Sequence, residues 1–302
     1  MRKIFCLQRM KTTDSLQRFV FEHAAIRGEL VHLDNTWRAV LDRHDYPPAV
    51  RNLLGELMAA AVLLSATLKF TGSLILQIQG NGPVHLLVVE STSERTLRGM
   101  AQWTGEPEPM PFPALVGEGR FVITIDPKEG GQRYQGIVNL EGETVAAALE
   151  NYLARSEQLD SRIWLAADTR QAAGMLLQKL PGDQNQDEDS DMWMRATHLG
   201  ATITRDELLA LPAREVIRRL YHEEDVRLFD SEDVRFRCSC SRERVTNVLR
   251  MLGYDEVQSI LNERNAVDVD CEFCNQHYTF DRVDAEQIFA SELGTKISPT
   301  RH

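Results

Sequence analysis

Apolar residues recur at helical spacing in the N-terminal half of the chain. Between residues 47 and 69 they form one long series, Leu53, Leu54, Leu57, Ala61, Leu64 and Leu68. Pro47 and Pro48 stand at its start, and proline is accepted in the first turn of a helix. The pattern predicts a long helix over 47–69. A second series, Val145, Ala148, Leu149 and Tyr152, predicts a shorter helix over about 143–155.

Strand-like runs separated by turn residues follow the long helix. Leu74–Gln79 and Val84–Glu90 flank Gly80-Asn81-Gly82-Pro83, which predicts a hairpin. The other predicted strands are Arg120–Asp126 and Arg133–Leu140, on either side of a loop with Gly130-Gly131, and then Ile163–Ala167 and Met175–Leu180. Helices and strands do not alternate as in a βαβ repeat, so residues 1–180 are predicted to form an α+β domain.

The composition changes after residue 180. Residues 181–191, PGDQNQDEDSD, include five acidic residues and no large apolar one, so they are interpreted as a solvated loop or linker. Short helical patterns follow over 192–230, and Thr204 with Glu207 matches a capping box. Helices this short are unstable alone in water. They form either a helical subdomain packed on its neighbours or a region that docks conditionally, and 181–230 is interpreted as an acidic loop and helical linker.

Four of the five cysteines lie in the segment 231–290. They form two close pairs, Cys238-Ser239-Cys240 and Cys271-Glu272-Phe273-Cys274, with 30 residues between the pairs. Two such pairs are typical of a zinc site, because zinc binds four ligands at tetrahedral corners. We therefore predict a small zinc-binding domain over 231–290 and a flexible tail over 291–302. The expected ligands are Cys238, Cys240, Cys271 and Cys274.

The sequence around the cysteines fits such a site. Ala266–Asp270 and His277–Phe280 alternate as strands, which places the second pair on the turn of a hairpin. Ser241 can cap a helix that ends at Gly253, so the first pair precedes a helix N-terminus, where thiolates are favoured. His277 is an alternative ligand, but with four thiols present we interpret it as a strand residue.

Chemistry beyond metal binding is limited. A four-cysteine set leaves no open coordination position, so hydrolysis by zinc-bound water is not expected. The sequence has no phosphate-binding loop, no H-E-x-x-H and no G-x-S-x-G motif, and we predict a protein that is not an enzyme. The zinc site is either structural or a redox switch, because oxidation to disulfides would remove zinc and about 10–16 kcal/mol of apparent binding free energy. Cys6 stands outside the set and is interpreted as a small buried apolar residue.

The charge balance restricts the partners. The chain has 34 Lys+Arg against 45 Asp+Glu, a formal net charge of −11, which argues against a duplex nucleic-acid binder. The longest apolar stretch, Leu57–Leu68, is too short for a membrane span of about 20 residues, and the N-terminal residues do not resemble a secretory signal. We therefore expect a cytoplasmic protein without membrane or nucleic-acid partners, in a reducing compartment that favours metal binding over permanent disulfides.

Two segments around the cysteines also carry a family resemblance. Phe236–Arg244, FRCSCSRER, followed by Cys271–Cys274, CEFC, closely resembles the signature of the bacterial redox-regulated heat-shock holdase chaperones, the 33-kilodalton chaperonin family. Gly80–Pro83, Tyr134–Val138 and Tyr152–Leu159 resemble that family's N-terminal domain. The resemblance implies an N-terminal mixed α/β substrate-binding domain, a helical linker and a small C-terminal four-cysteine zinc domain.

The resemblance also implies a mechanism. The four cysteines would hold one zinc per chain in the reduced, inactive state. Hypochlorous acid, or peroxide with heat, would join Cys238 to Cys240 and Cys271 to Cys274, release zinc and unfold the linker. The activated chain, a homodimer, would then hold unfolding client proteins without ATP and prevent their aggregation under oxidative and heat stress.

Two other functions stay open on the residues alone. A constitutive zinc-ribbon module would bind its partner only with zinc present and would lose activity on oxidation. A thiol–disulfide oxidoreductase would use Cys271 and Cys274 and would turn over disulfide substrates. A holdase, in contrast, would gain activity on oxidation.

Overall fold

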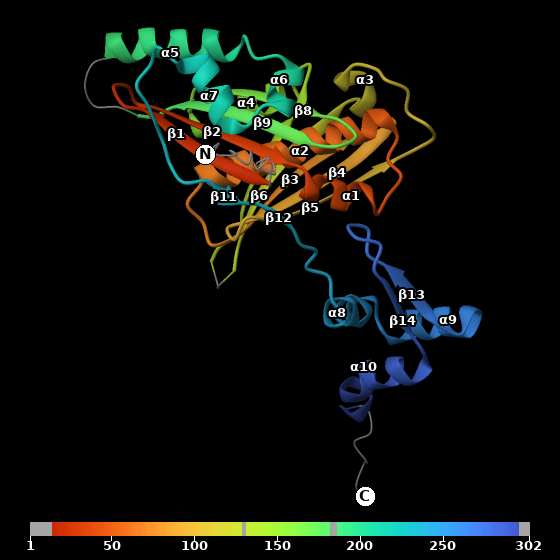
Figure 1. Cartoon of the computed structure of the whole chain (residues 1–302). Helices are drawn as coiled ribbons and strands as arrows, with labels where there is room; N and C mark the ends of the chain where they lie inside the picture. Colours follow the sequence, from red (N-terminus) through yellow and green to blue (C-terminus); the bar gives the residue numbers. More distant parts are fainter. Residues whose placement is uncertain (1–13, 129–130, 182–185, 296–302) are drawn as a thin grey trace, which may run out of the picture. The chain divides into compact units, whose positions relative to one another are not determined.

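Two structural units follow one another along the chain. The computed structural model describes residues 14–128, 131–181 and 186–295, with side chains described over 14–128, 131–181 and 191–290. Contacts within the chain divide it into Met1–Arg237 and Cys238–His302, called here the N-terminal and the C-terminal unit (Figure 1).

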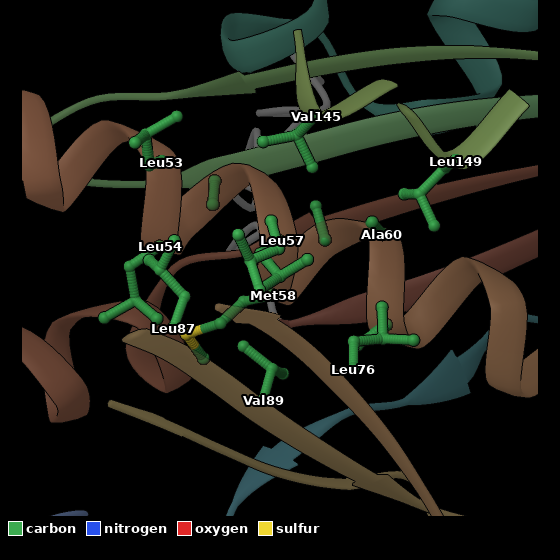
Figure 2. Close-up of a cluster of buried hydrophobic side chains, with 14 of the residues drawn as sticks. Leu53, Leu54, Leu57, Met58, Ala60, Leu76, Leu87, Val89, Val145 and Leu149 are labelled. Carbon is green, nitrogen blue, oxygen red and sulfur yellow. The ribbon is translucent and has the colours of Figure 1, made fainter. Parts of the chain in front are cut away.

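Helix α2 (Pro48–Thr67) runs through the middle of the N-terminal unit and confirms the helix predicted over 47–69. Two sheets cover it, and its buried side chains belong to one core with residues of both sheets. Figure 2 shows Leu57 and Met58 of this helix among apolar side chains from the second sheet and from helix α4 (Val145–Tyr152). Gly55 allows a close approach, because a Cβ there would lie 2.5 Å from the Cβ of Ala167.

Length and composition alone would let α2 cross a membrane. It has 20 residues with a hydropathy of 1.4, so the argument from the shortness of the apolar stretch does not hold. Its place in the fold gives another reason for its composition, because 78% of the stretch is buried inside the protein. A helix that is covered on two sides needs apolar residues nearly all round.

The first sheet, called sheet A, combines strands from distant parts of the sequence. Its order is β10 (Val226–Leu228), β1 (Ser15–Phe21), β2 (Ile26–Leu33), β9 (Ala172–Lys179) and β8 (Ser161–Ala167), and β11 (Glu232–Asp233) also pairs with β1. All of these pairings are antiparallel. β8 and β9 confirm two predicted strands, whereas β1 and β2 were not predicted.

The second sheet, called sheet B, lies on the other side of α2 (Figure 1). Its order is β12 (Arg235–Phe236), β5 (Thr96–Trp103), β4 (Val84–Thr92), β3 (Gly72–Gly80), β6 (Gly119–Pro127) and β7 (Tyr134–Asn139). The antiparallel pairs β3–β4 and β6–β7 confirm the predicted strand pairs. Only the pairing of β12 with β5 is parallel among the strands of this sheet.

Short helices close the ends of this core. The helix predicted over 143–155 is α4 (Val145–Tyr152), whose cap residue Thr144 accepts a hydrogen bond from the amide of Ala147. All four predicted apolar positions of α4 are buried. The helix continues as a π-helical turn, η1 (Leu153–Glu157). Two further short helices pack against the same core, α1 (Asn35–Leu41) and α3 (Phe112–Val116).

Three helices cover the other face of sheet A (Figure 1). They are α5 (Gln186–Gly200), α6 (Arg205–Ala210) and α7 (Ala213–Tyr221). The predicted capping box is present, because Thr204 accepts from the Glu207 amide and the Glu207 side chain accepts from the Thr204 amide. Buried residues of α6 and α7 pack with the outer face of sheet A in a second core, as the docked interpretation of 192–230 expected.

Two details of the predicted linker were wrong. Residues 186–191 were interpreted as loop, but they begin α5, and acidic residues are favoured in the first turn of a helix by its dipole. The helical pattern assigned to 192–230 ends at Tyr221, after which Val226–Leu228 is a strand. Residues up to Arg237 belong to the N-terminal unit, and a functional linker over 181–230 stays a prediction.

The C-terminal unit contains α8 (Arg242–Leu252), α9 (Tyr254–Arg264), β13 (Val267–Asp270), β14 (His277–Phe280) and α10 (Arg282–Thr295). Ser241 caps α8 as predicted, and β13 with β14 forms the predicted hairpin. The predicted tail from residue 291 was wrong in part, because α10 runs to Thr295. Its buried apolar core is small: Leu249, Val257, Leu261, Val267, Phe280, Ala285, Ile288 and Phe289.

One carboxyl group is buried without full compensation in the N-terminal unit. Glu29 on β2 is 2% exposed, and its Oε2 atom has no hydrogen-bond partner among the described residues. Burial raises the pKa of Glu29 to about 8, although the nearby charges of Arg27, Arg95 and Arg18 act to lower it. Glu29 therefore carries a proton at neutral pH in the folded chain.

This protonation predicts a pH dependence of stability. The folded chain keeps a proton that the unfolded chain releases above the ordinary value of 4.5, so the free energy of unfolding falls as pH rises toward 8. Glu29→Gln should remove this decline and stabilise the chain at pH 8 by up to roughly 4 kcal/mol relative to wild type. Urea unfolding at pH 5 and pH 8, followed by tryptophan fluorescence, measures the difference. Exposed Glu106→Gln is the control, and an unchanged pH dependence in Glu29→Gln would contradict the assignment.

Candidate metal centre

Four sulfur atoms meet in the C-terminal unit. The Sγ atoms of Cys238, Cys240, Cys271 and Cys274 all lie within 4.8 Å of one another. Cys238 Sγ is 3.7 Å from Cys271 Sγ, and Cys240 Sγ is 3.4 Å from Cys274 Sγ. The two cysteine pairs, 30 residues apart in the sequence, are thus brought into one cluster, as their spacing predicted.

Local structure fixes each pair. The second pair occupies the turn between β13 and β14, where the amides of Cys274 and Asn275 donate to the Cys271 carbonyl at 3.1 and 2.7 Å. Asn275 takes a positive φ of 54°, which asparagine accepts more readily than most residues. The first pair comes just before α8, whose cap Ser241 accepts from the Arg244 amide at 3.2 Å.

The cluster has the geometry and chemistry of a four-thiolate metal site. Sulfurs at tetrahedral corners around zinc, about 2.3 Å from it, lie about 3.8 Å from each other, close to the separations of the two sulfur pairs. Burial raises the pKa of Cys271 and of Cys274, so these thiols resist ionising without a nearby cation. A divalent cation would supply that charge, and the four close cysteines could hold a metal ion.

Tyr278 is a neighbour of the cluster that the sequence analysis did not single out. Its hydroxyl donates to Cys240 Sγ at 3.2 Å, and this interaction raises the pKa of Tyr278 to about 12. Strand alternation could have found it, because Tyr278 shares a face of β14 with buried Phe280. A hydroxyl donor to a ligand sulfur is the outer support that metal sites commonly have.

The other candidate residues near the cluster have structural partners. His277 lies on β14 as predicted, with Nδ1 2.7 Å from Asp270 Oδ1 and Nε2 3.3 Å from Asp268 Oδ1. Arg242 forms an ion pair with Asp284 at 2.8 Å. Cys6, interpreted from the sequence as a buried apolar residue, lies outside the described residues.

The Cys271-x-x-Cys274 pair lacks the setting of a redox enzyme. A thioredoxin-type motif opens a helix after a strand. Here strands stand on both sides of the pair, and its sulfurs belong to the four-sulfur cluster. The geometry therefore favours a shared metal site over an independent oxidoreductase motif.

Comparison with known proteins places this site in a family. The family model described as Hsp33 protein matches residues 14–281, nearly the whole described chain and all four cysteines. The chain belongs to the Hsp33 family. It is identified as a member of the same family that the cysteine signature resembled, and the family is one of chaperones, which bind client proteins.

Full-length Hsp33 relatives agree with this assignment. The 33 kDa chaperonin of Methylobacillus flagellatus is 51% identical over 294 residues, covering 97% of this chain and 100% of the relative. That of Nitrosococcus oceani is also 51% identical, over 293 residues with the same coverage. The crystal structure of the 33 kDa chaperonin from Thermotoga maritima matches with a TM-score of 0.79 at 21% identity, covering 93% of this chain and 99% of that one, and shows the same fold.

Substitutions can test whether Cys274 or the alternative ligand His277 binds the metal at the Hsp33 cluster. Cys274→Ser should lose the metal and increase amide hydrogen exchange across residues 238–289, because the apolar core of this unit is small and a bound metal would add to its stability. Exchange in α2 should not change. His277→Ala is the matched control and should keep the full metal content, since its ring bonds Asp270 instead. Elemental analysis and hydrogen-exchange mass spectrometry measure both, and metal loss in His277→Ala would contradict the ligand set.

Proposed function

We propose that the chain is a redox-regulated, ATP-independent holdase of the Hsp33 family. It is inactive while reduced and zinc-bound, and it becomes active when its cysteines are oxidised. The convergence of the four sulfurs within 4.8 Å carries the proposal, because one cluster contains both the metal ligands and the redox-sensitive groups. Family membership supplies the chaperone activity that the cluster would control.

Zinc would be the resident metal, one ion per chain. Cys238, Cys240, Cys271 and Cys274 would hold it, and zinc would supply the charge that keeps four crowded sulfurs as thiolates. The C-terminal unit buries only a short set of apolar residues. A unit of this size commonly needs a metal or a disulfide to stay folded. Its folding would therefore depend on the state of the sulfurs.

Oxidation would proceed pair by pair. Two thiolates give up two electrons and form one S–S bond, while hypochlorous acid takes up those electrons and leaves as chloride and hydroxide. The family resemblance assigns the bonds to Cys238–Cys240 and Cys271–Cys274. The close sulfur contacts in the folded cluster run between the pairs, 238 to 271 and 240 to 274. Peptide mapping of the oxidised chain distinguishes the two pairings.

The signal would reach the N-terminal unit through the chain that joins the two units. Loss of the C-terminal fold would loosen residues 181–230 and free α5, α6 and α7 from sheet A. The face that they cover is apolar, with Phe19, Phe21, Leu30, Met175 and Leu177. Such a surface, once exposed, suits binding of unfolding proteins.

The remaining features of the proposal come from the family resemblance and the charge. The active form would be a homodimer that protects unfolding clients in the cytoplasm during oxidative and heat stress. No nucleic acid, membrane or nucleotide would be needed. The net charge of −11 would help to keep client complexes soluble.

The deciding experiment pairs zinc release with client protection. A thermally unfolding client is incubated with the full chain before and after hypochlorite, without ATP, while released zinc is measured with a chromogenic chelator. We expect release of one zinc per chain and suppression of aggregation only after oxidation. Cys6→Ser, which changes the cysteine outside the cluster, should behave as wild type. Retention of zinc, or its release without any gain in protection, would overturn the proposal.

The segment before the cysteines is attached by ion pairs, and we expect their strength to set how much oxidant is needed for activation. Glu232 pairs with Arg18 at 2.6 Å and with Arg95 at 2.8 Å, and it is partly buried. Glu232→Gln should weaken this attachment by about 1 kcal/mol, or about fivefold in the released population, so activation should need less hypochlorite. Asp233→Asn makes the same charge change at the exposed neighbouring position and should leave the threshold unchanged. Equal thresholds for wild type and Glu232→Gln in the aggregation assay would contradict this role.

A further inference from the structure

One continuous segment supplies edge strands to both sheets of the N-terminal unit. Residues 226–237, called here the edge segment, contain β10, β11 and β12. β10 and β11 pair with β1 of sheet A, and β12 pairs with β5 of sheet B. Among its twelve residues only Val234 is buried. The strand pairings are made by backbone groups, and the side chains that add to them include Glu232, Val234 and Phe236.

At sheet A the edge segment completes the hydrogen bonds of β1. Phe19 faces Leu228 and Phe21 faces Val226 in antiparallel register. The amide of Phe229 donates to the Arg18 carbonyl at 3.0 Å. At the end of the pairing, the Glu22 amide donates to the Asp225 carbonyl at 2.9 Å. Without the edge segment, this side of β1 would present unpaired amides and carbonyls.

At sheet B the same segment completes β5. Arg235 faces Thr96, and Phe236 faces Leu97, in parallel register. The amide of Arg235 donates to the Arg95 carbonyl at 3.0 Å, and that of Arg237 donates to the Leu97 carbonyl at 3.1 Å. Removal of β12 would therefore open a second strand edge, that of β5.

Pairing at these two edges places few requirements on the sequence of the strand that is added. The strand pairing itself is made by backbone groups, which every polypeptide has. The side-chain requirement at β1 is apolar residues two positions apart, because Leu228 and Val226 share a face with Phe19 and Phe21. Leu228 itself is still 37% exposed, so even this contact is loose. Open edges of this kind accept extended chains by strand addition.

We propose that the edges of β1 and β5 are client-binding sites, and that the edge segment occupies them as an internal competitor. The partner is an extended stretch of an unfolding protein with apolar residues at alternate positions, added as a further strand to either sheet. This inference rests on the proposed holdase function and names the part of the client that is recognised. It differs from capture on an exposed apolar face, because the client's main chain supplies the contacts.

A peptide of residues 225–237 tests the proposal on the full-length oxidised chain. The fluorescently labelled peptide should bind, reduce amide hydrogen exchange in β1 and β5, and lower client protection at saturation by at least tenfold. A second peptide with the same sequence carries N-methyl groups at Phe229, Arg235 and Arg237, whose amides make the edge hydrogen bonds. It keeps every side chain and should bind at least tenfold more weakly. A scrambled peptide controls for composition.

The outcomes separate this inference from the proposed function. If the oxidised chain protects clients but the N-methylated and unmodified peptides compete equally, side chains carry recognition and the inference fails while the holdase function stands. If oxidation gives no client protection, the holdase function fails, and peptide binding with protection of β1 and β5 still decides whether the edges accept extended chain. Conversion of dimers to monomers by the peptide would assign the edges to a second copy of the chain and overturn the client assignment.

Discussion

Burial of α2 between two sheets is the constraint on which the N-terminal unit depends. A helix with apolar residues nearly all round must be covered on more than one side, and sheets A and B do this. Because the helix lies between them, the two sheets do not pair with each other at β1 and β5. Each of these strands would otherwise be an edge strand, and the edge segment provides a further partner for both. The position of the edge segment thus follows from the packing of the core helix.

The sequence predicted those features whose signal is local. The spacing of α2, the turn between β3 and β4, the capping box at Thr204 and the paired cysteines all appeared in the structure as expected. β1 and β2 were missed although they are long, since β2 is buried on both faces and shows little alternation. β10, β11 and β12 are two or three residues long and mostly exposed, so no periodicity marks them. Their partners are more than a hundred residues away, which only the folded chain reveals.

The cysteine cluster could be predicted nearly in full, because a tetrahedral metal demands four ligands and the chain offers two close pairs. The sequence did not predict the hydrogen bonds that surround the cluster. Tyr278 donates to Cys240 Sγ, and His277, a candidate ligand by spacing, is engaged by Asp268 and Asp270. Because the apolar core of the C-terminal unit is small, its fold would depend on the sulfur cluster. In a larger domain the same cluster would be redundant, and its oxidation would change little.

The parallel strand β12 ends one residue before Arg237, and the cluster begins with Cys238. If the proposed switch operates, disturbance of the C-terminal unit would reach β12 first, then the ion pairs of Glu232, and β10 last. The edge segment would detach progressively from its C-terminal end, which would open the edge of sheet B before that of sheet A. Such an ordered detachment would give intermediate states with one edge open, so that a brief or mild stress would yield a partial response that could reverse from the end still attached.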